Sequence, residues 1–184
     1  FGVPRDQVRV IPRGVNLEEF RFKPPPHGPH GPWRIGLFGR LSPLKGQAVA
    51  LRACERLVQR GLPVRLCLAG DAPGSSARRS LESLAAALGL EEHVEWLGVR
   101  QDMPALIASV DLVIVPSTYP ESFGRSVIEA QAVGRPVIAS RLGALPELIE
   151  DGRTGLLVPP NDAAALAEAI HRFIGDAALR VRCV

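Results

Sequence analysis

The sequence predicts an α/β fold with a doubly wound parallel sheet, and three observations lead to this prediction. Short apolar runs alternate with stretches of helical periodicity along most of the chain. Glycine occurs in the segment that follows four of the five main runs, as expected where a strand turns into a helix. No repeat or linker divides the sequence. Because parallel strands joined by helices need right-handed crossovers, we expect one domain over residues 1–184, with helices on both faces of the sheet.

Strands are expected where Val, Ile and Leu run almost without interruption, which is typical of parallel strands buried on both faces. A short additional strand is expected at Val8–Ile11, before a Pro-Arg-Gly turn. The proline-rich stretch 24–32 cannot hold regular structure, so we expect a loop there. The five main runs are Arg34–Phe38, Val64–Ala69, Val94–Leu97, Leu112–Val115 and Val137–Ala139.

Helices are expected between these runs, each followed by a glycine. In the first, Ala50, Cys54 and Leu57 form an apolar face, and Gly61 ends the helix. The others are expected at about Ser76–Leu88 before Gly89, at about Phe123–Val133 before Gly134, and after an N-cap at Asn161 or Asp162, with Gly175 beyond the end.

The composition excludes several classes of protein. Hydrophobic residues make up 46% of the chain and charged residues 22%, which is ordinary for a globular domain and unlike a disordered chain. The net charge of +3 is too small to indicate nucleic-acid binding. No apolar run approaches the roughly 20 residues that a membrane-spanning helix needs. The cysteines, Cys54, Cys67 and Cys183, lack metal-ligand spacing, so we expect a reducing, cytoplasmic location with Cys54 and Cys67 in the core.

The loop after the first main run carries two cations. Ligands of a doubly wound sheet bind outside the carboxyl ends of its strands, and this loop, residues 39–46, reads GRLSPLKG. It matches neither a Walker A loop nor the G-x-G-x-x-G dinucleotide fingerprint. Arg40 offers a forked guanidinium and Lys45 a compact ammonium at the start of a helix, where anions are favoured. These groups suit a diphosphate; a solvated turn is the alternative.

The loop after the fourth run carries two acids. Glu121 precedes a helix and Glu129 lies about two turns inside it. A carboxylate can accept hydrogen bonds from two vicinal hydroxyls, as in ribose or a sugar ring. The alternatives are an acid favourably placed at a helix start and an exposed helical residue. Yet this helix is apolar on most sides, so a carboxylate at Glu129 needs a partner. Cations and acids on one rim together indicate a nucleoside diphosphate that carries a sugar.

Two other classes of function stay open on these residues. In an NAD-type dehydrogenase domain, Asp71 would stand where such domains place the acid that binds ribose. Against this class, the glycine fingerprint is missing and the two cations have no role. The other class is a non-catalytic module that binds nucleotide sugars or a partner protein, because a fold alone does not fix a function.

The pattern Gly39-Arg40, Lys45-Gly46, and then Glu121 and Glu129 separated by seven residues closely resembles one known family. That family is the family 4 retaining glycosyltransferases (glycosyl transferases group 1), which have the GT-B fold of two Rossmann-like domains. The resemblance is to their donor-binding C-terminal domain. The resemblance extends over nearly the whole chain through the segments Val10–Asn16, Gly134–Ala139 and Pro146–Pro159. The chain departs from the pattern at Arg13, where Asn is common, and at Ala144, where a second glycine is common.

The resemblance implies how transfer of a glycosyl group would be catalysed. Arg40 and Lys45 would neutralise the donor diphosphate, and Glu121 would hold the donor sugar, which makes these three the expected catalytic residues. The two cations would take the place of a metal ion in stabilising the leaving diphosphate, so we expect no metal. We expect no cofactor either, because the nucleoside-diphosphate sugar, of UDP or GDP, is itself a substrate.

The resemblance also implies the remaining contacts with the donor. Backbone amides around Phe123 and Gly124 would help to hold the sugar, and Glu129 would hold the ribose. The backbone near Val99 and Arg100 would meet the base. The expected donor-binding set is therefore Gly39, Arg40, Lys45, Val99, Arg100, Glu121, Phe123, Gly124 and Glu129.

The partners implied by the resemblance are the donor, an acceptor of unknown identity, and a second domain. That domain, which binds the acceptor in this family, would precede Phe1, so we interpret the chain as a fragment that is inactive alone. No nucleic acid is expected. The resemblance also admits a peripheral location of the parent protein at the inner face of a membrane.

Overall fold

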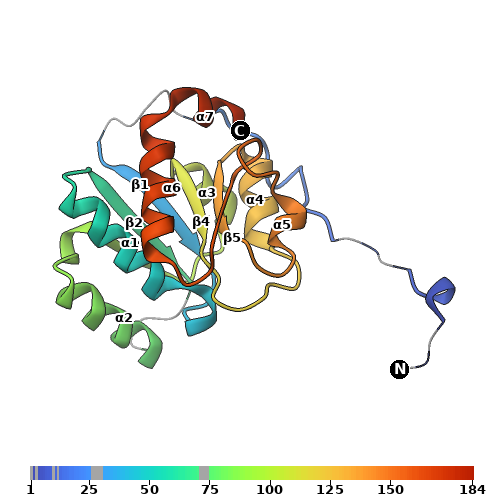
Figure 1. The fold of residues 1–184 in the computed structure, drawn as a ribbon, viewed down its shortest axis with the longest axis horizontal. Coiled ribbons are helices and arrows are strands. Elements are labelled where there is room, and N and C mark those ends of the chain that lie inside the picture. The colour runs from blue at the N-terminus through green and yellow to red at the C-terminus, as the bar shows by residue number, and fades with distance from the viewer. Residues whose placement is uncertain (1, 3, 10, 12, 26–30, 71–74) are drawn as a thin grey trace.

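A computed structural model describes residues 2, 4–9, 11, 13–25, 31–70 and 75–184. The described chain forms a six-stranded sheet in which every pairing is parallel, with the strand order β3-β2-β1-β4-β5-β6 (Figure 1). The strands are β1 (Trp33–Phe38), β2 (Val64–Ala69), β3 (Val94–Gly98), β4 (Leu112–Val115), β5 (Val137–Ser140) and β6 (Leu156–Val158).

Helices cover both faces of this sheet (Figure 1). One face carries α1 (Gln47–Gln59), α2 (Ser76–Ala87), α6 (Ala163–Gly175) and α7 (Ala177–Arg182). The other face carries α3 (Met103–Ala108), α4 (Arg125–Val133) and α5 (Leu145–Leu148). None of the helices in the described part of the chain is long and apolar enough to cross a membrane.

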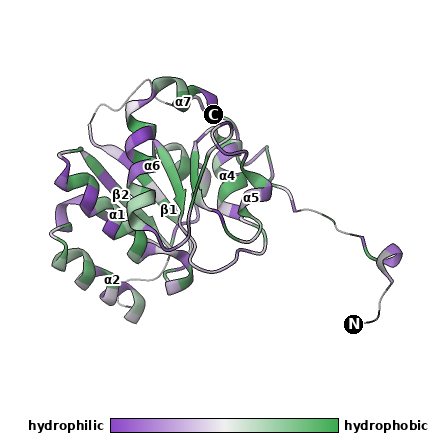
Figure 2. Ribbon diagram, in the orientation of Figure 1, coloured by the Kyte–Doolittle hydropathy of each residue, from purple (hydrophilic) through white to green (hydrophobic). Residues whose placement is uncertain are grey.

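The core follows from the alternation of side chains along the buried strands. Ile114 packs into the cluster under α1 and α6, while its neighbours Val113 and Val115 pack into the cluster under α3 and α4. Both faces are therefore apolar, as Figure 2 shows for the strands. Cys54 and Cys67 fill this core as predicted, and burial raises the pKa of each thiol to about 12.

The order of the strands reverses between β1 and β4. The chain proceeds outward from β1 through β2 to β3, then returns to place β4 on the other side of β1. The connections therefore leave β1 and β4 toward opposite faces, and a crevice opens where the carboxyl ends of these two strands lie side by side. Such a switch point is where a doubly wound sheet binds its ligands.

A segment before the sheet is fixed against α4. Phe20 is 4% exposed, and the amide of Lys23 donates to the carbonyl of Val133. The buried guanidinium of Arg135 donates to the carbonyls of Lys23 and Ala108. These contacts hold Phe20 and Lys23 beside the second half of the sheet, and Arg13 lies earlier on the same segment.

The five main strands and the doubly wound fold are confirmed, but the prediction of a strand at Val8–Ile11 was wrong. Of its residues, 8, 9 and 11 are described, and none is in a strand; Val8 and Ile11 are 56% and 83% exposed. An apolar run with no neighbour to pair with does not form a strand. The sequence analysis also missed β6 and the short helices α3, α5 and α7. Residues 26–30 of the predicted loop lie outside the described residues.

The four predicted helices are present, with shifted ends. Gly61 and Gly134 follow helices in the left-handed conformation, with φ of 75° and 78°. Asp162, not Asn161, caps α6, because its carboxylate accepts from the amide of Ala165 at 2.8 Å. Gly175 is the last residue of α6 rather than the residue beyond it.

We predict that Gly46→Ala destabilises the fold far more than Gly61→Ala. Both glycines have positive φ, 72° and 75°, so a side chain costs about 1–2 kcal/mol at either. At Gly46 a Cβ would also lie 1.9 Å from the carbonyl oxygen of Pro116, whereas at Gly61 it would meet nothing within 4 Å. The clash adds about 1–3 kcal/mol. Urea unfolding of both variants gives the comparison, and equal losses would show that the two loops are not in close contact at Gly46.

Candidate functional site

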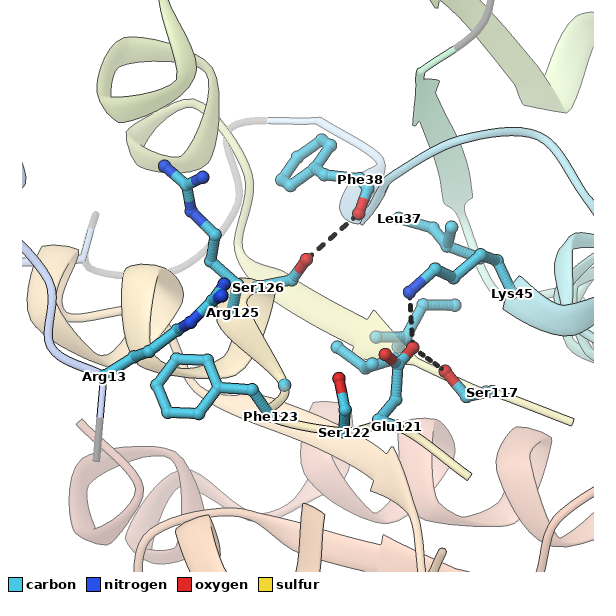
Figure 3. A pocket seen from close by; sticks show the side chains of 13 residues that line it. Arg13, Leu37, Phe38, Lys45, Ser117, Glu121, Ser122, Phe123, Arg125 and Ser126 are labelled. Atoms are coloured by element: carbon cyan, nitrogen blue, oxygen red, sulfur yellow. Dashed lines mark hydrogen bonds and ion pairs between the residues drawn. The ribbon is translucent and has the colours of Figure 1, made fainter. Parts of the chain in front are cut away.

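A pocket lies at the switch point, outside the carboxyl ends of β1 and β4 (Figure 3). Its walls come from both strands, from the loops that follow them, from the first turn of α4, and from the segment before the sheet. The lining residues are Arg13, Leu37, Phe38, Lys45, Ile114, Val115, Ser117, Glu121, Ser122, Phe123, Gly124, Arg125 and Ser126.

Lys45 is positioned by contacts between the loops after β1 and β4. It ends a single 3-10 turn, Pro43–Lys45, and the left-handed Gly46 then opens α1. The amide of Thr118 donates to the carbonyl of Leu44 at 3.0 Å, and the Thr118 hydroxyl donates to the carbonyl of Pro43 at 2.8 Å. The two loops therefore form one unit, and the Lys45 ammonium points into the pocket (Figure 3).

Glu121 meets Lys45 across the pocket. The Lys45 Nζ lies 2.5 Å from Glu121 Oε1, and the hydroxyl of the fully buried Ser117 donates to the same oxygen at 2.7 Å (Figure 3). The side chains of Lys45 and Glu121 are 34% and 17% exposed, so the pair is only partly solvated. Among the described residues, Glu121 Oε2 has no hydrogen-bond partner. One oxygen of the carboxylate is thus fixed, and the other is available to a ligand.

The backbone of Glu121 is held by the loop after β5. The amide of Ala144 donates to the Glu121 carbonyl at 2.9 Å. A Cβ at Gly143 would lie 2.5 Å from the amide nitrogen and the carbonyl oxygen of Glu121, so only glycine permits this approach. Gly143 and Ala144 therefore fix the position of the acid.

The N-terminus of α4 closes the pocket. Gly124 precedes the helix, and no side chain of the described residues caps its first amides. Uncapped amides and the helix dipole give this end a partial positive charge, which favours an anion. The hydroxyl of Ser126 donates to the carbonyl of Phe38 at 3.1 Å and ties the helix to β1 (Figure 3).

A second hollow lies next to the pocket, between α4 and the segment before the sheet, and it contains Glu129. The Glu129 side chain is 10% exposed, and its Oε1 accepts from Arg125 Nε at 2.6 Å. The acid is therefore buried with a partner, not an exposed helical residue. The hollow is lined by Arg13, Gly14, Val15, Asn16, Glu19, Phe20, Phe123, Arg125, Ile128 and Glu129.

The other predicted site residues lie outside both hollows. Arg40 is exposed, and its carbonyl accepts from the buried Gln47 side chain at 3.0 Å. Val99 is 63% exposed on the loop after β3, where the Arg100 guanidinium pairs with Asp102. Gly39 follows β1 directly and does not line the pocket. Asp71, the residue of the dehydrogenase alternative, lies outside the described residues. No group of three potential metal ligands occurs in the described part of the chain.

Comparison with known proteins decides between the glycosyltransferase and the dehydrogenase classes. A family model described as glycosyl transferases group 1 matches residues 32–176. The chain belongs to this family. The predicted family and the Rossmann-like half of a GT-B fold are confirmed, and the assignment to family 4 stays a prediction. The family consists of glycosyl transferases, so the dehydrogenase alternative is set aside.

Relatives of this glycosyl transferase domain cover it almost completely. A D-inositol 3-phosphate glycosyltransferase of Nocardia farcinica is 37% identical over 96% of the chain. The Anabaena protein HepE, solved in complex with UDP-glucose, is 33% identical over 99% of the chain, with a TM-score of 0.87. The C-terminal domain of a group 1 glycosyl transferase, LpcC of Francisella tularensis, is 25% identical with a TM-score of 0.78, and the match covers 92% of each chain.

The glycosyl transferase domain is shorter than most of these relatives. It covers 42% of the Nocardia protein and 52% of the HepE chain. The Nocardia protein and HepE thus contain about as much sequence again outside the matched region.

The sequence analysis did not single out Ser117, Arg125 or Ser126 as site residues of the glycosyl transferase domain. Ser117 follows the fourth predicted strand directly on the rim, and Arg125 precedes Glu129 by four residues on a helix, so both positions carried a signal. Ser126 carried none, since its partner is a backbone carbonyl from another strand.

We predict that Lys45 and Glu121 are coupled more strongly than a surface ion pair. A double-mutant cycle on unfolding free energy with Lys45→Ala and Glu121→Ala is expected to give about 1 kcal/mol of coupling. The control is the cycle for Arg60 and Glu168, which also join distant elements but are 46% and 64% exposed. That pair is expected to give less than about 0.5 kcal/mol. Equal coupling in both cycles would mean that Lys45 and Glu121 do not form the partly buried pair.

Proposed function

We propose that this domain binds the nucleoside-diphosphate sugar donor of a retaining glycosyltransferase and supplies the donor half of its active site. The observation that carries the proposal is the Lys45–Glu121–Ser117 cluster in the switch-point pocket, directly before the uncapped N-terminus of α4. A cation, an acid with one free oxygen and a row of amides match the diphosphate and hydroxyl groups of such a donor.

The diphosphate binds between Lys45 and the first amides of α4. Lys45 supplies a point charge, and the amides before Ser126 supply hydrogen bonds without a counterion. Arg40, exposed on the same rim, reaches the diphosphate from outside the pocket. These charges stabilise the leaving diphosphate when its bond to the anomeric carbon of the sugar breaks, so no metal ion is required.

The two glutamates bind the two hydroxyl-bearing ends of the donor. Glu121 accepts from the transferred sugar through Oε2, because Lys45 and Ser117 occupy Oε1. The amides around Phe123 and Gly124 complete the sugar site. Glu129, in the neighbouring hollow, accepts from the ribose hydroxyls. The base lies along the backbone near Val99 and Arg100, beyond the described hollows.

Uridine is the base we favour. Its support is the likeness to HepE, a protein solved in complexes with UDP, with UDP-glucose, and with UDP and glucose. The acceptor and the groups that exclude water come from a second domain of the parent protein, in the part that the relatives contain beyond the matched region. The domain by itself is therefore expected to bind donor but to transfer no sugar.

The test of this proposal measures how a change at each glutamate affects the binding of two ligands, UDP and UDP-glucose. Glu121→Gln is expected to weaken UDP-glucose binding by about 10- to 100-fold and to leave UDP almost unchanged, since UDP has no sugar for Glu121 to contact. Glu129→Gln is expected to weaken both ligands alike, because both contain ribose. Calorimetric titration of both variants supplies the four affinities. Equal losses of UDP and UDP-glucose in Glu121→Gln would remove Glu121 from the sugar site.

Binding is also expected to be independent of divalent metal. The UDP affinity of the unmutated domain is expected to be the same in EDTA as in Mg²⁺. Lys45→Ala is expected to lower that affinity by about 10- to 100-fold in either buffer. The same calorimetric titration measures this. Loss of UDP binding in EDTA would transfer the role assigned to Lys45 to a metal ion.

A further inference from the structure

Two arginines stand between the hollow of Glu121 and the hollow of Glu129. The residues that line both hollows are Arg13, Phe123 and Arg125. Figure 3 shows Arg13 and Arg125 on the side of the pocket opposite Lys45, with Phe123 beside them. A ligand that contacts both glutamates must therefore pass these two guanidinium groups.

The order of charges along this path is acid, cations, acid. Glu129 lies at one end, Arg13 and Arg125 lie in the middle, and Glu121 lies at the other end. A nucleoside-diphosphate sugar has the complementary order, with ribose hydroxyls, a doubly charged diphosphate and then sugar hydroxyls. We infer that Arg13 and Arg125 bind the diphosphate of the donor; this rests on the proposed function and adds to it two residues outside the donor-binding set expected from the sequence.

Arg125 can hold an acid and a phosphate together. Its Nε donates to Glu129 Oε1 at 2.6 Å, which uses one of the five N–H groups of the guanidinium. The side chain is 78% exposed, so the remaining N–H groups are accessible to a ligand. A phosphate on those groups would be joined through Arg125 to the carboxylate that receives the ribose. The ion pair thus fixes the distance between the ribose site and the diphosphate site.

Arg13 reaches the same place from a different part of the chain. Its segment is anchored further along by the buried Phe20 and by the hydrogen bond from Lys23 to Val133. Arg13 itself is exposed, and no described residue forms an ion pair with it. Its charge is therefore available to an anion, and a bound diphosphate would hold this segment against α4. With Lys45 on the opposite wall, the diphosphate would be surrounded by cations on two sides.

The test compares Arg13→Met and Arg125→Met with the control Arg21→Met. Arg21 lies on the same segment as Arg13, is exposed, and lines neither hollow, so its removal changes the net charge equally. The whole domain is titrated with UDP by calorimetry and with uridine by NMR. UDP affinity is expected to fall about ten-fold in each of the two variants and less than two-fold in the control. Uridine, which has no phosphate, is expected to lose less than three-fold in Arg13→Met.

Three outcomes would overturn the inference. Wild-type affinity for UDP in both variants, while Lys45→Ala still weakens it, would remove the arginines from the site and leave the proposed function intact. Equal losses of UDP and uridine in Arg13→Met would mean that this arginine acts on the nucleoside instead of the phosphates. No binding of UDP, GDP or ADP by the unmutated domain would contradict the proposed function, and this inference with it.

Discussion

The reversal of strand order between β1 and β4 is the constraint on which the site depends. Parallel strands need right-handed crossovers, so a chain that fills one side of β1 first must return to the other side with its helices on the opposite face. The loops after β1 and β4 then diverge and leave a crevice. The contacts of Thr118 with Pro43 and Leu44 fix the width of this crevice and place Lys45 opposite Glu121.

Glu121 and Glu129 are each paired with a cation before any ligand is present. Lys45 pairs with Glu121, and Arg125 pairs with Glu129, so neither partly buried acid is left without a cation. These contacts use only one oxygen of each carboxylate. The protein therefore holds both acids in fixed positions while their second oxygens take no part in these contacts, and a donor need not reorganise the site to bind. Such preorganisation is what electrostatic stabilisation of a leaving group requires.

The fold and the chemical character of the site could be predicted from sequence, while its local geometry could not. Buried parallel strands such as Leu112–Val115 are continuous apolar runs, and a rim with Lys45 and Glu121 follows from where strands end. β6 has three residues, too few for a pattern, and residues 8, 9 and 11 have no strand paired with them in the described part of the chain. Two features of the site depend on how side chains are placed across loops. Lys45 and Ser117 share one oxygen of Glu121, and Arg125 stands between two hollows.

The central claim is that the crevice between β1 and β4 receives a nucleoside diphosphate, and amide NMR tests it most directly. The ¹⁵N-labelled domain is titrated with UDP and the shifted amides are mapped on the structure. The account predicts shifts concentrated in residues 39–47 and 117–129, on both sides of the switch point. Shifts confined to the opposite end of the sheet, around Lys23 and Arg135, or no shift with UDP, GDP or ADP, would contradict it.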